Sequence, residues 1–308
     1  MIQEKITSYA KNLGFDLVGF AKASPDKSSL AFYKKWLKEG KNADMQYLEK
    51  FSPRENLKEI LPTAKTVIVL GMNYYHGQKP LRKGYGRVAK YAYGRDYHKI
   101  IGKKLKQLEA FIKTLDPNAE TKSYVDTGPI LERSFAEQAG IGVVGKNSCL
   151  ITKEFGSWIF LAEIITNLKL KTLSRVSKKF SVCGSCTRCM DACPTKAIVA
   201  SGVIDSRKCI SYLTIENKGR IPGKFAKEIK KSRRIYGCDI CQEVCPHNCR
   251  ANENQHEELK NPKIAGDELS IKKILSIKLD AEFLKLFAGS PIMRAKRKGL
   301  KRNARILE

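Results

Sequence analysis

The sequence predicts an α+β protein with three parts: an N-terminal α/β domain over residues 1–172, a cysteine-rich domain over residues 173–255 and a short helical segment over residues 256–308. Three observations support this prediction. In the first part, stretches with apolar residues at helical spacing alternate with stretches that have the apolar pattern of a strand. Near residue 170 the sequence becomes basic and patternless, which indicates a linker. Nine of the ten cysteines lie between residues 181 and 250.

The elements of the first part follow from these periods in chain order. The first helix places Ile2, Ile6 and Tyr9 on one face, and Gly14 is a natural stop. Glu163 interrupts the apolar run of the last strand. Helices are predicted over residues 2–14, 28–40, 96–117 and 130–140, and strands over residues 15–21, 65–75, 122–129 and 156–166. Such a set of elements fits one domain of ordinary size.

The net charge and the distribution of apolar residues indicate the kind of partner and the cellular compartment. The net charge is +27, which favours a polyanionic partner, although a solvated lysine-rich surface explains it equally well. No apolar run is long enough to span a bilayer, and the N-terminus lacks the apolar core of a signal peptide. We therefore expect a cytoplasmic protein with no membrane partner. In a reducing compartment, ten cysteines favour metal or redox chemistry over disulfides.

The first cysteine run, "CGSCTRCMDACP" at residues 183–194, has the complete spacing C-x2-C-x2-C-x3-C-P. Bacterial two-cluster ferredoxins carry this run, and its fourth cysteine binds the other cluster. Thiolates suit iron–sulfur irons because they are soft, charged donors. The run therefore predicts a ferredoxin-like domain with two 4Fe–4S clusters.

The second run, "YGCDICQEVCP", has the last three cysteines of the same motif, but Ile235 stands where the first is expected. Cys209 is the available substitute. By the crossover rule one cluster is assigned to Cys183, Cys186, Cys189 and Cys245, and the other to Cys193, Cys209, Cys238 and Cys241. A pair of zinc sites is the alternative, although zinc ribbons use paired C-x2-C knuckles. Of the two remaining cysteines, Cys149 is expected to be a core thiol, and Cys249 lies beside a cluster without binding it.

The first part has no clear nucleotide motif. "GIGVVG" at 140–145 follows a helix instead of a strand, which argues against a nicotinamide fingerprint. "DYHKIIG" resembles the D-x-H-x-x-G motif of base-off cobalamin proteins, but Ile101 stands in place of its glycine. Asp96 capping a helix with an ordinary His98 in its first turn explains that stretch better. Asp126 ends a strand before a Gly-Pro turn and is expected to point into a cleft, although an aspartate there often only caps the turn.

Several motifs together resemble one family. "VDTGPILER", "GKN", "CGSCTRCMDACPTKAI", "DSRKCISYLTIENKG" and "RIYGCDICQEVCP" are similar to tRNA epoxyqueuosine reductases, and "SPRENL" and "KYAYGRDYH" fit the same family. The resemblance implies reduction of epoxyqueuosine to queuosine at the wobble position of tRNAs with GUN anticodons, the last step of queuosine biosynthesis. It implies base-off cobalamin that receives electrons through the two clusters from an external donor such as a flavodoxin or ferredoxin. We expect a monomer.

The resemblance also implies roles for single residues. Asp126 would be the proton donor, with a pKa raised by burial against the corrin. Arg54, Ser211, Asp239 and Ile240 would touch the corrin, and Lys146 with Asn147 would contact cofactor or substrate. Basic stretches would bind phosphates of the anticodon stem-loop; the candidate residues there are Lys218, Arg220, Arg297, Lys298, Lys301 and Arg302.

Two other functions compete with this one. A reductive dehalogenase-like corrinoid enzyme shares the cofactors, and a non-enzymatic electron carrier needs only the clusters. The strong positive charge favours the tRNA enzyme over the dehalogenase. Many members of the resembled family continue into a helical-repeat domain, whereas this sequence ends at Glu308. Some tRNA contacts are therefore expected to be absent or supplied differently.

Overall fold

The computed structural model describes residues 1–308 except 78, 174–181 and 261–263. The second half of the predicted linker lies outside the described residues. A four-stranded sheet organises the first part in the order β1-β2-β7-β4, with every neighbouring pair antiparallel. Its strands are β1 (Leu17–Lys22), β2 (Thr66–Asn73), β7 (Ile159–Thr166) and β4 (Thr121–Tyr124). All four predicted strands of this part are confirmed.

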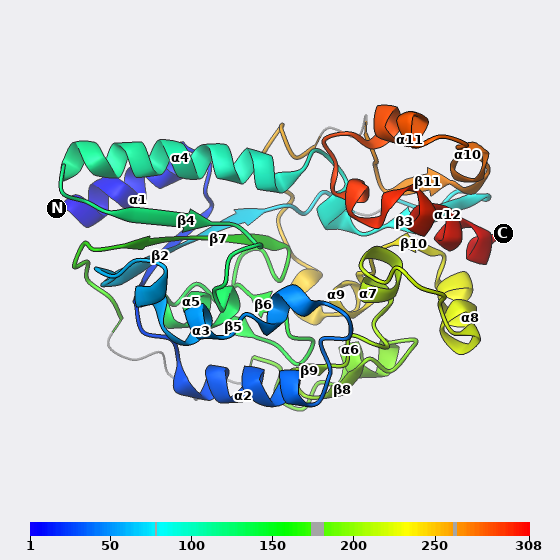
Figure 1. Ribbon diagram of the computed structural model, residues 1–308, viewed down its shortest axis with the longest axis horizontal. Coiled ribbons are helices and arrows are strands. Elements are labelled where there is room, and N and C mark those ends of the chain that lie inside the picture. The colour runs from blue at the N-terminus through cyan, green and yellow to red at the C-terminus, as the bar shows by residue number, and fades with distance from the viewer. Residues whose placement is uncertain (78, 174–181, 261–263) are drawn as a thin grey trace.

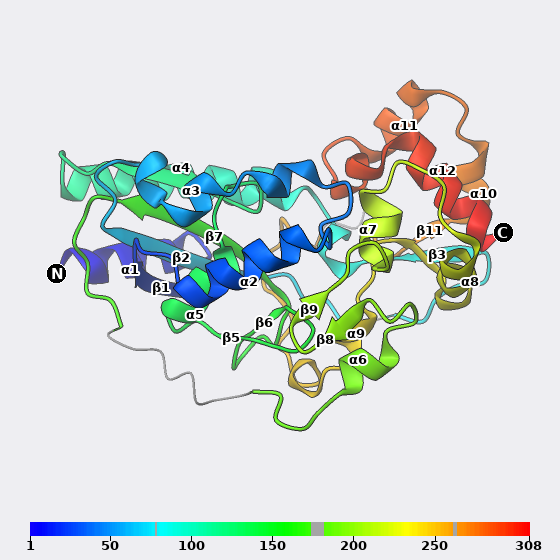
Figure 2. The same ribbon diagram turned by 60° about the horizontal axis from the view of Figure 1, so that its bottom comes forward.

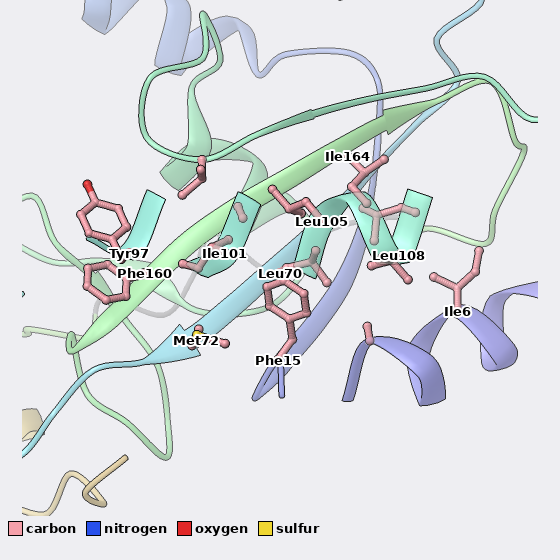
Figure 3. Close-up of a cluster of buried hydrophobic side chains, with 14 of the residues drawn as sticks. Ile6, Phe15, Leu70, Met72, Tyr97, Ile101, Leu105, Leu108, Phe160 and Ile164 are labelled. Atoms are coloured by element: carbon pink, nitrogen blue, oxygen red, sulfur yellow. The ribbon is translucent and has the colours of Figure 1, made fainter. Parts of the chain in front are cut away.

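Helices cover both faces of this sheet (Figure 1). On one face, α1 (Ile2–Asn12) and α4 (Tyr97–Leu115) pack against Ile68, Leu70 and Met72 of β2. Figure 3 shows Leu70 and Met72 in this layer. On the other face, α5 (Glu132–Gln138) packs against Val67 and Val69. Successive side chains of a strand point to opposite faces, and both faces of this sheet are covered. β2 is therefore buried along its whole length, which explains its long apolar sequence.

A second sheet joins all three predicted parts. It has the order β10-β3-β11, with β3 (Tyr85–Val88) in the centre, β10 (Arg234–Tyr236) parallel to it and β11 (Glu268–Ser270) antiparallel. These short strands were not predicted. The C-terminal segment also contacts the first part directly, because Leu259 lies in the core under α4 and His256 Nε2 lies 2.9 Å from Asp16 Oδ2. The three segments are therefore interleaved.

The cysteine-rich region lies beneath this second sheet (Figure 2). Its elements are α6 (Arg188–Ala192), β8 (Ile198–Ala200), β9 (Val203–Ile204), α7 (Ile210–Ile215), α8 (Gly223–Ser232) and α9 (Ile240–Glu243). The helix α2 (Lys27–Lys38) bridges to it from the first part, because Trp36 Nε1 donates to the Ile204 carbonyl at 2.7 Å. The hairpin of β5 (Val143–Val144) and β6 (Leu150–Ile151) also contacts this region, because Ser148 in its loop donates to the Gly202 carbonyl at 2.7 Å.

The C-terminal segment is helical, as predicted. It contains α10 (Ile271–Ser276), α11 (Asp280–Phe287) and α12 (Lys296–Leu307), and the two termini lie at opposite ends of the molecule (Figure 1). The remaining elements are α3 (Ser52–Glu55) and 3-10 turns at Gln46–Glu49, Leu57–Glu59, Lys90–Ala92, Pro246–Asn248 and Pro291–Ala295. Among the described residues, none of the helices combines the length and apolar character needed to cross a membrane.

Candidate active site

Eight cysteines of the cysteine-rich region line two separate hollows, four in each. The first, of about 400 Å³, is lined by Cys183, Cys186, Cys189 and Cys245. The second, of about 380 Å³, is lined by Cys193, Cys209, Cys238 and Cys241. Each hollow is lined by the four cysteines of one expected ligand set, with Cys209 as the substitute for the missing first cysteine of the second run.

Local structure directs the sulfur atoms into the hollows. Cys189 lies on α6 and Cys241 on α9, and these two short helices lie close together (Figure 2). Backbone N–H groups donate to two of the sulfurs, from Ala197 to Cys193 Sγ at 3.2 Å and from Lys146 to Cys183 Sγ at 3.4 Å. Such donors stabilise thiolate charge, so the donor set fits an iron–sulfur cluster in each hollow.

The loop at residues 146–149 connects the two hollows. Lys146 Nζ donates to the carbonyls of Gly184 and Cys186 at 2.8 and 3.0 Å, so its ammonium lies against the first hollow. Asn147 Nδ2 reaches the Cys241 carbonyl at 3.4 Å beside the second hollow. The Cys149 thiol, expected to be an ordinary core thiol, is partly buried and donates to the Asn147 carbonyl at 3.8 Å.

Asp126 lies in the turn that follows β4. Its backbone is left-handed, with φ of +58°, and its side chain is 59% exposed. Gly128 permits this tight turn, because a Cβ there would lie 2.6 Å from Tyr124 Cγ. The Asp126 carboxylate lies 3.3 Å from His98 Nε2, and Asp96 Oδ1 lies 2.7 Å from the other ring nitrogen of His98. The stretch "DYH" therefore supplies a partner for Asp126, in addition to the predicted helix cap at Asp96.

The charges of this cluster place the proton on the histidine. Partial burial lowers the pKa of His98, but its hydrogen bonds to Asp126 and Asp96 outweigh burial and raise that pKa to about 9. Burial also raises the pKa of Asp126, but hydrogen bonds from His98 and Tyr97 and the charges of His98 and Arg294 together lower it. Without a corrin the pKa of Asp126 is therefore lowered, whereas the upward shift expected from the sequence depends on burial against the corrin. The reason for the lowered pKa is that a cationic imidazole stabilises the carboxylate.

Of the expected corrin contacts, Ile240 lines the second hollow, Ser211 and Asp239 lie near its cysteines in sequence, and Arg54 lies on α3. Ser211 stands in the first turn of α7, two residues after Cys209. Asp239 is buried, accepts the Lys90 backbone N–H at 2.7 Å, and has its pKa raised by burial to about 6. Arg54 is also buried, and its guanidinium donates to the Lys50 carbonyl without a carboxylate partner among the described residues. A buried cation of this kind suits a polar cofactor.

The basic residues of α12 differ in what they contact. The Arg302 guanidinium donates to the carbonyls of Leu213, Asn217 and Gly219, each at 2.7 Å. Lys301 donates to the Ile277 carbonyl, and Arg297 pairs with Asp280 at 2.6 Å. These three side chains are occupied within the fold, which limits the expectation that they bind phosphates. The side chains of Lys298, Lys218 and Arg220 are exposed as expected.

Sequence reasoning missed an aromatic and basic pair near Asp126. Tyr47 is 48% exposed, and the Arg294 guanidinium lies 5.5 Å from its ring centroid. Glu216 holds Arg294 through two hydrogen bonds of 2.9 and 3.0 Å. The charge of Arg294 also acts on Asp126. The only sequence signal was the basic tail that contains Arg294.

This fold and site define an iron–sulfur oxidoreductase with an acid–base group outside its cluster region. Residues 182–248 match the family model "4Fe-4S double cluster binding domain", and residues 54–127 match "Epoxyqueuosine reductase QueG, DUF1730". The epoxyqueuosine reductase of Gloeobacter violaceus is 40% identical over 98% of this chain and 94% of its own. That of Cellulophaga algicola is 41% identical over 98% and 97%. The chain belongs to the epoxyqueuosine reductase family.

Solved structures agree with this assignment. The epoxyqueuosine reductase of Bacillus subtilis, with its catalytic loop swung out of the active site, matches with a TM-score of 0.89 and 33% identity, over 99% of this chain and 80% of its own. A structure of an epoxyqueuosine reductase with an epoxyqueuosine-modified tRNA-Tyr stem loop matches with a TM-score of 0.89 and 34% identity, over the same shares. A catabolic reductive dehalogenase has a TM-score of 0.50 at 15% identity, over 97% of this chain and 38% of its own, a likeness of fold alone.

Proposed function

We propose that this protein reduces epoxyqueuosine to queuosine in the anticodon loop of tRNA. The observation that carries the proposal is the Asp96–His98–Asp126 cluster in a chain that also holds two four-cysteine hollows. Opening an epoxide leaves an oxygen that needs a proton, and its full removal to an alkene consumes two electrons and two protons and releases water. The protein has groups suited to both requirements.

The lining of the two hollows supports the proposed cluster ligands. Cys183, Cys186, Cys189 and Cys245 hold one 4Fe–4S cluster, and Cys193, Cys209, Cys238 and Cys241 hold the other. A small external donor such as a flavodoxin or ferredoxin reduces them. Cobalamin, bound base-off, would supply low-potential reducing chemistry for the epoxide. The buried side chains of Arg54 and Asp239, with Ser211 and Ile240, are the residues that would hold the cobalamin.

The proton path follows from the pKa values of the cluster. His98 carries the proton near neutral pH, and Asp126 accepts its hydrogen bond. The Asp126 carboxylate takes that proton from His98 Nε2 and passes it to the substrate oxygen, so the carboxyl is neutral only during transfer and His98 ends the step as a neutral imidazole. Asp96 holds the other ring nitrogen and fixes the orientation of the imidazole.

The tRNA surface is proposed on α12 and the neighbouring loop at 217–220. The Arg302 guanidinium on α12 donates to two carbonyls of this loop and so holds the loop against the helix. The exposed side chains of the loop, Lys218 and Arg220, therefore lie beside the exposed Lys298 and Arg305 of α12. Arg297 and Lys301 border this surface while they stabilise the helix. The net charge of +27 supports a polyanionic substrate. A monomer acting on tRNA in the cytoplasm is consistent with these features.

The test is conversion of an epoxyqueuosine-modified stem loop by protein reconstituted anaerobically with iron, sulfide and cobalamin. We expect queuosine in digested RNA, at a yield that falls to background without cobalamin. Reduction of a halogenated phenol without RNA conversion would instead identify a dehalogenase. Cluster reduction without corrinoid binding would identify an electron carrier.

A further inference from the structure

Glu163 is a buried acidic residue in an otherwise apolar part of β7. It lies in the middle of β7, opposite Val69 on one side and Tyr124 on the other, and it is 0% exposed. Its side chain faces the apolar layer between the sheet and α5, because its strand neighbours at positions 162 and 164 belong to the core of the opposite face. Neither carboxyl oxygen accepts a hydrogen bond from a donor in the part of the chain that the structure describes.

An isolated ionised carboxylate in such a layer would be very costly, so Glu163 must be neutral or share a proton. Among the described residues, the polar side chain that acts on Glu163 is that of Glu132, the first residue of α5. Burial raises the pKa of Glu163 well above its ordinary value, and the charge of Glu132 adds to this effect. Glu163 is therefore the protonated partner and donates to Glu132, in the manner of other carboxyl pairs that share one proton.

Glu132 in turn contacts the turn that carries Asp126. Its Oε1 accepts the backbone N–H of Asp126 at 2.8 Å. This bond holds a residue whose left-handed φ of +58° is unfavourable for a side chain with a Cβ. Bonds from an N–H to a charged acceptor are stronger than neutral ones, so ionisation of Glu132 stabilises the turn.

We propose that Glu132, supported by the protonated Glu163 behind it, is the positioning residue that fixes the Asp126 turn for proton transfer. The chain of contacts runs from the buried Glu163 through Glu132 to the Asp126 backbone, and from the Asp126 carboxylate to His98. This inference rests on the proposed function and adds a second layer to its site. Glu163 interrupts an apolar strand because it keeps Glu132 in place and charged.

The pair has a consequence for pH. The charged and titratable groups around Glu132 are Asp126, Glu163, Arg133 and Tyr97. Burial, followed by the charge of Asp126, raises the pKa of Glu132 to about 7. Below that pH Glu132 becomes neutral, and the bond that holds Asp126 weakens. Turnover should therefore rise with pH through about 7.

The experiment compares variants of the holoenzyme in single-turnover conversion of the modified stem loop across pH. Glu132→Ala should lower kcat by as much as about 100-fold with little change in KM, because misplacement of a catalytic group by about 1 Å has an effect of this size. Glu163→Gln should behave like the wild type, because its amide N–H still donates to Glu132. Glu163→Leu removes that donor, so it should move the acid limb of the profile to higher pH.

Glu137→Ala is the matched control. Glu137 also lies on α5 and also accepts a backbone N–H, that of Val144 at 2.7 Å, but it holds a different loop. Its loss should leave kcat and the pH profile unchanged. An unchanged kcat in Glu132→Ala, or an acid limb that stays in place in Glu163→Leu, would overturn the proposal.

Hydrogen exchange gives a readout that does not depend on the reaction. In Glu132→Ala the Asp126 amide should exchange about tenfold faster or more, as expected for loss of a bond to a charged acceptor, while it stays protected in Glu137→Ala. If the wild type converts no epoxyqueuosine but this difference is present, the proposed function fails and the positioning contact stands. Equal exchange in all variants would show that Glu132 does not hold the turn.

Discussion

At the scale of single residues, the Asp96–His98–Asp126 cluster decides how the site handles a proton. The two carboxylates flank one imidazole, at 2.7 and 3.3 Å, and each favours its charged form. The cluster thus keeps a transferable proton near neutral pH although the Asp126 carboxyl is ionised. A lone aspartate with a lowered pKa would be a poor acid under the same conditions.

The basic limb of the activity profile should therefore report His98. Its pKa is raised from 6.5 to about 9, so turnover should fall as pH rises through about 9. The stability that His98 contributes has the same sign, because a raised pKa stabilises the fold fully below about 6.5 and loses this effect as pH rises through about 9. In His98→Gln we expect lower turnover, no basic limb, and a smaller fall in melting temperature over that range than in the wild type. A basic limb that persists in this variant would assign it to another group.

The sequence predicted Asp126 but not its partners. "DYH" resembled both a cobalamin motif and a helix cap, and its pairing with Asp126 depends on a turn that lies 28 residues further along the chain. The role of Glu132 was hidden for a similar reason. Its bond goes to a backbone N–H, which carries no residue-specific signal.

At the scale of elements, the short helices α6 and α9 place cysteines of the two runs around the hollows. The close spacing within each run makes this arrangement predictable from sequence. Cys209 belongs to neither run, and its place in the second hollow depends on the start of α7.

Single cysteine variants should separate the two clusters. Cys209→Ser should lose iron and EPR signal from the cluster of the second hollow, and Cys245→Ser from that of the first, because each removes one of four ligands. Iron counting and EPR on anaerobically reconstituted protein measure this. Retention of both clusters at full occupancy in Cys209→Ser would remove that residue from the ligand set.

Variants of α12 should separate the effects of its basic residues on folding from their effects on tRNA binding. Replacing the exposed Lys298 and Arg305 with Gln should weaken binding of the stem loop and lower the slope of log K against log salt by roughly 0.7 to 0.9 per lost phosphate contact. Arg302→Gln should instead lower the free energy of unfolding by about 1 kcal/mol, because partly buried carbonyls lose their donor. Unchanged affinity and slope in the double variant would mean that the phosphate contacts lie elsewhere.

At the scale of the whole molecule, the second sheet unites segments that the sequence separates. The long strands of the first sheet could be predicted because each is an extended apolar run between turn signals. Strands β3, β10 and β11 have only three or four residues each and pair across more than a hundred positions, so no local period marks them. The three sequence segments remain useful descriptions of composition.

This interleaving predicts that the cluster region does not fold alone. A fragment of residues 173–308 lacks β3, the central strand of its sheet, and should expose the apolar residues that pack on it. We expect such a fragment to aggregate or to bind less iron than the full chain after identical reconstitution. A fragment with full iron content and a cooperative thermal transition would show that the region is an independent domain.

The most direct test of the account compares the wild type with Asp126→Asn in a single turnover. Both proteins are reconstituted with clusters and cobalamin, reduced to the same extent, and mixed with the epoxyqueuosine-modified stem loop. The amide keeps the shape of the side chain but has no acid proton, so queuosine should form about 10²–10⁴-fold more slowly, with equal cluster reduction and equal RNA binding. Equal rates of queuosine formation in the two proteins would contradict the central claim that the proton reaches the substrate through Asp126.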